Sequence, residues 1–427
     1  MQAFEKKDFN QAEKILDNKN LEKQKRNLLL YYLNKGTVLH MAGKYKESNV
    51  YLQKADYFIE DFHTNYGLAA ASLLTNPSVR PYDGENHEKI LLHYYSTLNY
   101  LQLNNLDEAL VECKRMLLTM QHISDYYQGN NKYKRDAFTH LLLGLIYDAQ
   151  NDVNNAFIAY RNAYEVYKND YAKNLGTEPP LQLKKDILRT AYQNGFYSEL
   201  DLFEKEFGIK YDLKDKTTSD LVCFWNKDLC PIKIPYYIDF LITDMGNGYL
   251  LFTNLELGFS IPVYIGDKST DKDKLIKMKI IRVAIPKLES RKPKYINATI
   301  EKGNTVYPFE LAENIDAIAF LSLKDRMEKE LAETLLRFSL KRIAEMEARK
   351  ESVSLGIAVN IFNAITEQAD TRIWQMLPQT INYTRVNLIK GENNFAFRLT
   401  GNTSTITDSI CIDAKAKTTY FKTFVNY

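Results

Sequence analysis

The sequence predicts an N-terminal all-α domain of repeated helical hairpins and a C-terminal α+β domain with mostly antiparallel strands and two helices. This prediction depends on three observations: a repeat of small and aromatic residues in the first half, short β-branched and aromatic runs in the second, and a length of 427 residues. A chain of this length is too long to fold around one ordinary hydrophobic core. We place the domains at residues 1–211 and 219–427, because residues 211–216 are charged and have no sustained periodicity.

The repeat is clearest in Gly36–Ala55 and Gly144–Ala163, which match at one constant offset. Gly, Ala or Ser stands where two helices must approach closely, and Gly or Asn stands where the first helix ends in a left-handed conformation. The equivalent positions are Gly36, Leu39, Gly43, Tyr45, Ser48, Leu52 and Ala55 in one segment and Gly144, Tyr147, Asn151, Val153, Ala156, Tyr160 and Ala163 in the other. Weaker copies are expected at Thr97–Met116 and Gly195–Phe207, and Lys7–Leu16 matches the second half of a copy. These spacings resemble the tetratricopeptide repeat, whose unit is about 34 residues.

Extra residues separate the copies. They are best placed at Phe62–Asn86, Gln121–Arg135 and Asp170–Pro180, where Gly, Pro, Asn and Tyr concentrate. All three segments follow the second helix of a copy, so we expect them to lie on one edge of the helical stack.

The inserted segments carry the residues that we expect to bind a protein partner: Arg80, Tyr82, Glu85, Tyr126, Tyr127, Tyr133 and Tyr171. Arg and Tyr are favoured in binding hot spots, and Pro77 and Pro81 stiffen the first segment. We expect Arg80 and Tyr82 to face outward beside the second segment. The alternative is a compact loop that covers a flank of the stack.

Beyond Tyr211 the pattern changes to short runs separated by turn signals such as Met245–Gly248. The predicted strands are Leu221–Trp225, Ile232–Thr243, Tyr249–Thr253, Phe259–Ile265, Lys279–Ile285, Tyr295–Ile300, Val306–Phe309, Thr384–Ile389, Asn394–Leu399, Thr405–Asp413 and Thr418–Val425. Apolar residues at helical spacing predict a long helix over Leu323–Met346. A second, more apolar helix is expected near Leu355–Glu367, packed against the sheet.

Charge and motifs exclude several functions. The 56 basic and 54 acidic residues nearly cancel, which disfavours nucleic-acid binding. The chain has no G-x-S-x-G elbow, phosphate-binding glycine loop or Cys-x-x-Cys motif. His87 and His93, beside Glu85 and Glu88, could hold a metal, but one packed and one surface histidine is the reading we favour. We therefore predict no metal and no cofactor.

Two further groups leave alternatives open. Cys223 and Cys230, on either side of a predicted turn with Trp225, could form a disulfide, although two free thiols are favoured. The run Asp370–Trp374 could anchor a partner or ligand. The favoured alternative is that it locks a helix end onto the sheet through side-chain hydrogen bonds.

Several segments also resemble a family of uncharacterised bacterial proteins with tetratricopeptide repeats. They are Leu74–Tyr82, Asn155–Ala163 and Glu367–Arg372 followed by Leu377–Pro378. Those proteins usually carry a lipoprotein signal and are often encoded beside lipoproteins similar to the curli secretion channel. The resemblance implies a periplasmic location with an outer-membrane lipid anchor upstream, whereas the cytoplasm is the alternative. No apolar run reaches the roughly 18 residues that a membrane-spanning helix needs, so we expect no transmembrane span.

These observations favour a non-enzymatic periplasmic scaffold or assembly factor that binds an envelope protein, such as another lipoprotein, through the helical-repeat domain. Stacked hairpins offer a broad concave face and one loop edge, which suit extended binding better than chemistry. The alternative is a cell-envelope enzyme or a glycan-binding module with its site in the α+β domain. Aromatic strands such as Pro235–Tyr237 could stack on sugars, although strand aromatics more often belong to the core.

Overall fold

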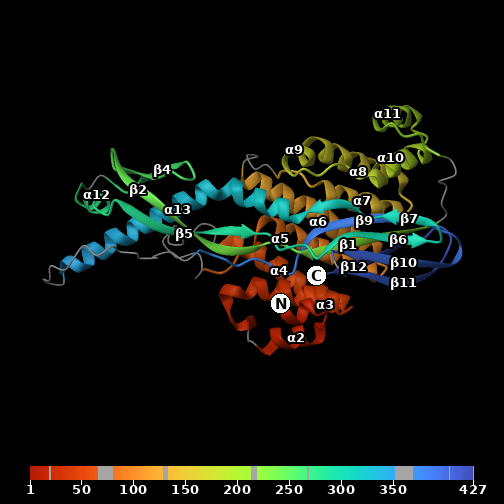
Figure 1. Ribbon diagram of the computed structural model, residues 1–427, viewed down its shortest axis with the longest axis horizontal. Coiled ribbons are helices and arrows are strands. Elements are labelled where there is room, and N and C mark those ends of the chain that lie inside the picture. The colour runs from red at the N-terminus through yellow and green to blue at the C-terminus, as the bar shows by residue number, and fades with distance from the viewer. Residues whose placement is uncertain are drawn as a thin grey trace.

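Figure 1 shows the computed structural model of the chain, with helices in the first half and mostly strands in the second. The described residues are 1–18, 21–65, 80–127, 133–212, 219–266, 269–351, 369–402 and 404–426. The helices are α1 (Gln2–Glu5), α2 (Phe9–Asn18), α3 (Leu28–Met41), α4 (Tyr45–Asn65), α5 (Asn86–Gln102), α6 (Leu106–Tyr126), α7 (Ala137–Ala149), α8 (Val153–Val166), α9 (Ala172–Asn174), α10 (Leu181–Gln193), α11 (Tyr197–Phe207), α12 (Ser269–Ile276) and α13 (Ile315–Glu351).

The strands are β1 (Ser219–Leu229), β2 (Ile232–Gly246), β3 (Tyr249–Asn254), β4 (Phe259–Tyr264), β5 (Ile280–Glu289), β6 (Tyr295–Lys302), β7 (Thr305–Pro308), β8 (Glu310–Asn314), β9 (Pro378–Leu388), β10 (Gly391–Gly401), β11 (Thr405–Ala414) and β12 (Thr419–Asn426). Within the described ranges they form three four-stranded sheets, ordered β12-β1-β9-β8, β11-β10-β6-β7 and β4-β3-β2-β5. The pairing of β1 with β12 is parallel, and the other described ladders are antiparallel.

Five helix-to-helix turns in the described chain have the same backbone geometry. The first helix of each hairpin ends at a residue with φ between 56° and 75°: Lys7, Gly43, Asn104, Asn151 or Gly195. The next N–H donates to a carbonyl five residues earlier at 2.9 Å in every case, as Lys44 does to Leu39. This is the bond of a Schellman cap. The predicted left-handed turns are therefore confirmed, and the stack consists of similar hairpins.

Close helix contacts explain the small residues of the repeat. A Cβ added at Gly36 would lie 2.7 Å from the Leu52 side chain, and one at Gly144 would lie 2.3 Å from the Tyr160 ring. Both distances are shorter than a carbon–carbon contact allows. Ser48 fits the same crossing because its hydroxyl donates to the Gly36 carbonyl at 2.8 Å.

The helical stack and two of the sheets form three layers. Val222 and Phe224 of β1 face the helices and belong to the same core cluster as residues of the stack. Leu221 and Trp225, on the other side of β1, pack against the sheet β11-β10-β6-β7. The strand is therefore covered on both faces, which explains its nearly continuous run of apolar residues.

The third sheet, β4-β3-β2-β5, projects from this body beside the outer part of α13, at the left of Figure 1. One of its faces packs on α13, where Leu331, Leu335 and Phe338 contact a core that includes Phe240 and Phe252. We call this sheet with α12 and α13 the arm.

The expected strands are present, but some details differ. Strand β8 and helix α12 were not predicted, and α13 is longer than the expected helix Leu323–Met346. The second expected helix, Leu355–Glu367, lies outside the described residues. Cys223 and Cys230 are buried free thiols, and Cys223 lies inside β1 instead of beside a turn.

The division at residues 1–211 and 219–427 follows the change from helices to strands, but the two parts share one core cluster. Phe138 of α7 and Phe224 of β1 have ring centroids 6.3 Å apart. The ring centroids of Trp374 and of Tyr95 in α5 are 5.5 Å apart. Apolar surface that each part buries against the other would be exposed if they separated.

We therefore expect limited proteolysis between residues 205 and 219 to give two fragments that remain associated. They should co-elute in native gel filtration and separate only in denaturant, because the shared core holds them together. Fragments that elute separately, each with cooperative unfolding, would show instead that the two parts are independent domains.

Candidate functional site

The three predicted insertions contact one another along one edge of the helical stack. The Asn86 amide nitrogen, at the end of the first, lies 3.5 Å from the Tyr127 hydroxyl of the second. The rings of Tyr133 and Tyr171, from the second and third, have centroids 6.4 Å apart. The expected shared edge is therefore present.

The chain's own C-terminal half covers this edge. The Tyr171 hydroxyl donates to Glu313 of β8 at 3.0 Å, and the Lys329 ammonium of α13 donates to the Tyr126 hydroxyl at 3.3 Å. The described residues of the insertions thus form an intramolecular interface with β8 and α13.

Most of the predicted partner-binding residues lie inside this interface. Tyr82, Glu85, Tyr133 and Tyr171 are buried, Arg80 and Tyr127 are half-buried, and Tyr126 is 67% exposed. The expectation that Tyr82 faces outward is wrong. Its hydroxyl donates to Glu88 at 2.7 Å, and the Arg372 guanidinium lies 5.3 Å from its ring centroid. A tyrosine covered by a distant segment needs such an internal partner for its hydroxyl.

Glu88 is the centre of a buried polar cluster at the start of α5. Its carboxylate accepts hydrogen bonds from the Tyr82 hydroxyl at 2.7 Å, the Glu85 N–H at 3.0 Å and the Trp374 N–H at 2.5 Å. Burial raises the pKa of Glu88 to about 7, and the charge of Glu85 adds to this increase, while the hydrogen bonds act in the opposite direction.

Glu85 links three elements that are distant in the sequence. Its carboxylate forms ion pairs with Lys233 of β2 and Arg326 of α13, and all three side chains are largely buried. Burial alone would raise the pKa of Glu85, but Arg326 and Lys233 outweigh it and hold the pKa well below its usual value. The residue predicted to contact a partner therefore holds α5 against the arm.

The run Asp370–Trp374 makes hydrogen bonds within the protein, to the helical half of the chain. The helix end that the favoured alternative places before it lies outside the described residues. The Arg372 guanidinium donates to the backbone oxygens of Arg26 at 2.7 Å and Arg80 at 2.9 Å. The Trp374 indole N–H donates to the Thr37 hydroxyl at 3.1 Å. These contacts position the segment that leads into β9.

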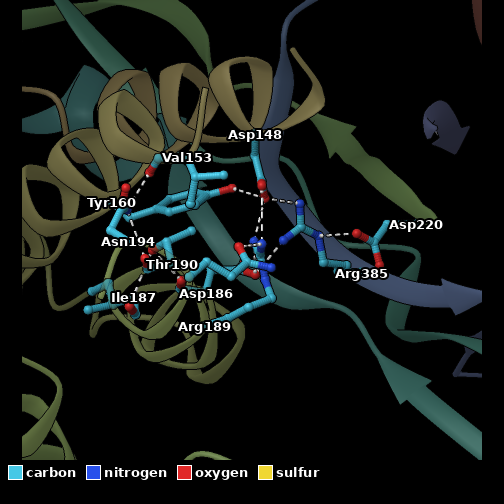
Figure 2. Close-up of polar contacts among 11 residues, drawn as sticks. Asp148, Val153, Tyr160, Asp186, Ile187, Arg189, Thr190, Asn194, Asp220 and Arg385 are labelled. Atoms are coloured by element: carbon cyan, nitrogen blue, oxygen red, sulfur yellow. Dashed lines mark hydrogen bonds and ion pairs between the residues drawn. The ribbon is translucent and has the colours of Figure 1, made fainter. Parts of the chain in front are cut away.

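A second ionic cluster, shown in Figure 2, joins β9 to the helices. Arg385 of β9 pairs with Asp186 of α10 and with Asp148 of α7, the latter at 2.6 Å. Arg189 of α10 donates to the other Asp148 oxygen at 3.1 Å. Burial tends to raise the pKa of Asp148, but Arg189 and Arg385 lower it well below its usual range. The cluster is buried and binds two helices to one strand.

The sequence analysis missed this cluster, although a signal was present. Asp148 is the one acidic residue of α7, whose other residues are mostly apolar. An acid in such a helix predicts a buried partner of opposite charge. Finding that partner required the fold, because Arg385 is more than two hundred residues away in the chain.

The two histidines considered for a metal do not converge. His87 lies near Glu85, Arg326 and Lys233, whereas His93 has its Nδ1 atom 2.8 Å from Glu112. No group of three or more His, Cys, Asp or Glu side chains in the described part of the chain is arranged to hold a metal ion. Two depressions of the described surface, at Asn104–Asp107 and beside Phe395, are open to solvent.

No protein-family model matches the chain, and a search of curated proteins finds no match.

We expect Arg385→Gln to reduce the free energy of unfolding by about 3–5 kcal/mol, because it removes one of the two arginines that pair with the buried carboxylates of Asp148 and Asp186. Arg398→Gln is the matched control, since Arg398 pairs with Glu301 at 2.7 Å in a more exposed position. Its loss should be no more than about 1 kcal/mol. Urea unfolding of both variants measures the difference, and equal losses would contradict a structural role for the cluster.

The buried Glu88 carboxyl predicts a specific pH dependence. Its folded-state pKa of about 7 lies above the usual 4.5, so the folded state binds this proton more tightly than the unfolded state does. Ionisation between about pH 4.5 and 7 should destabilise the wild type by up to about 3 kcal/mol relative to Glu88→Gln, which cannot ionise. Denaturant unfolding at pH 5 and pH 8 measures this difference. His40 and His87, with pKa values of about 4, act in the opposite sense but are present in both proteins. Stability curves that stay parallel with pH would contradict the assignment.

Proposed function

We propose that the protein is a non-enzymatic scaffold or assembly factor that binds protein partners through a tetratricopeptide-like helical stack. One observation supports this most directly. Two clusters of charged groups in the described residues, around Glu88 and around Arg385, are buried and paired with groups of the same chain. Their geometry serves to hold helices against strands, and neither cluster is open to a substrate.

The partner surface on the helical stack faces away from the sheet. The inward side is occupied, since Tyr94 of α5 donates to Asn226 of β1 at 2.9 Å. On the outer helices, exposed apolar residues recur seven residues apart, as Val50 and Tyr57 on α4 and Val111 and Leu118 on α6. This spacing places each pair on one side of its helix. Arg115 of α6 pairs with Asp56 of α4, so the two helices are neighbours.

A periplasmic location with an outer-membrane anchor is part of this proposal, and it depends on the family resemblance. None of the described helices has the length and apolar character needed to span a membrane.

The test uses the full chain as bait for partners in an envelope extract. Val111→Glu combined with Leu118→Glu places two charges on the proposed apolar surface of α6. Capture of the specific partner, quantified by mass spectrometry, should fall about tenfold or more, because charges at the centre of an apolar interface must lose water without gaining a partner.

The matched control adds two carboxylates at polar, exposed positions outside the helical stack, Thr407→Glu with Ser409→Glu on β11. It should capture the partner as the wild type does, and all three proteins should have the same thermal midpoint. If the α6 variant and the control retain the same proteins as the wild type, this surface does not bind the partner.

A further inference from the structure

The outward face of the arm sheet is unusually apolar. Side chains alternate along its strands, so that Phe240 and Phe252 point to α13 while their neighbours point away from it. The outward side chains include Tyr237, Leu241, Tyr249, Leu251, Tyr264 and Ile280. Five of these are between 39% and 56% exposed. A half-covered antiparallel sheet normally presents polar residues to water, so this face has the composition of an interface.

The other outward sheet face of the protein provides an internal comparison. On β10 of the sheet β11-β10-β6-β7, the exposed positions are Glu392, Asn394, Arg398 and Thr400. The outward side of β10 is therefore polar, as expected for a surface in water. The apolar outward face is therefore particular to the arm and is not a property of all the strands.

The edges of the arm sheet are protected, while its face is not. Pro262 lies in the edge strand β4 and Pro286 in the edge strand β5. Proline has no N–H to donate and so discourages a further strand from pairing with an edge. Association of this sheet with another molecule is thus directed to the face.

The charges on this face favour an identical partner. Asp239 and Arg282 point outward and pair with each other through two hydrogen bonds of 2.7 Å. Their charges cancel, so two copies of the face do not repel each other, and a twofold axis that runs between Asp239 and Arg282 would place each Asp near an Arg of the other copy. We propose that this face is a homodimer interface, in which the arm sheets of two copies pack face to face.

The area of this face is small for a protein–protein interface. Four strands about 4.8 Å apart and about seven residues long cover roughly 400 Å². A stable interface of standard size buries roughly 800 Å² per partner. We therefore expect a weak and reversible dimer that forms only at high protein concentration.

Sedimentation velocity of the full chain, diluted from about 100 µM to about 1 µM, tests this proposal. The wild type should change from dimer to monomer across the series. Leu241→Arg places an unpaired cation on the central strand, beside Ile280 and Thr253, and should weaken dimerisation at least about tenfold. Ser409→Arg, on the polar outward side of β11, adds the same charge elsewhere and should behave as the wild type does.

A second variant covers the case in which Leu241→Arg fails to fold. Tyr249→Ser combined with Tyr264→Ser removes two partly exposed rings that lie 5.1 Å apart, adds no charge, and should also shift the protein to monomer at an unchanged thermal midpoint. A wild type that is monomeric at about 100 µM would overturn the proposal. So would folded face variants that dimerise as the wild type does, or equal loss of the dimer in Ser409→Arg.

Discussion

The structure depends on a layer of strands that is buried on both faces. Phe224 of β1 packs against Phe138 of the helices, while Trp225, the next residue, packs against Phe309 on the opposite side. Because the central strands β1 and β9 are buried along most of their length, their polar groups need partners within the protein. The polar groups of the inner helices also need internal partners, since the sheet covers these helices.

Paired polar groups at the helix–sheet boundary follow from this constraint. Asn226 accepts a hydrogen bond from Tyr94 at 2.9 Å, and Arg385 pairs with Asp148 and Asp186. A buried ion pair adds little net stability compared with an apolar contact of the same size, but loss of one member is costly. We interpret these pairs as determinants of how the strands align with the helices, while apolar burial provides most of the stability.

Local features of the fold were predictable and distant contacts were not. The left-handed turns at Gly43 and Asn151 follow from residue type and spacing, because few other residues adopt positive φ at low cost. Strand β8 was missed because Glu310–Asn314 has two acids and no β-branched residue. Its extended conformation is stabilised by hydrogen-bonded pairing with β9 and not by its own residue types. The prediction of an exposed partner-binding site was wrong for the same reason, because it also depended on contacts between distant parts of the chain. Burial of Tyr171 depends on Glu313, which local sequence patterns do not reveal.

The tyrosines of the insertions show why composition located an interface but not its partner. Tyr133 donates to Asp136 and Tyr171 donates to Glu313, so each hydroxyl satisfies a buried acid. Burial, followed by the charge of Asp136, raises the pKa of Glu313 well above its usual value. Tyr and Arg are frequent in interfaces because they combine contact area with hydrogen bonding. The same physical properties suit a boundary within one chain, so these residue types indicate where surfaces meet and leave the identity of the second surface to be determined from the fold.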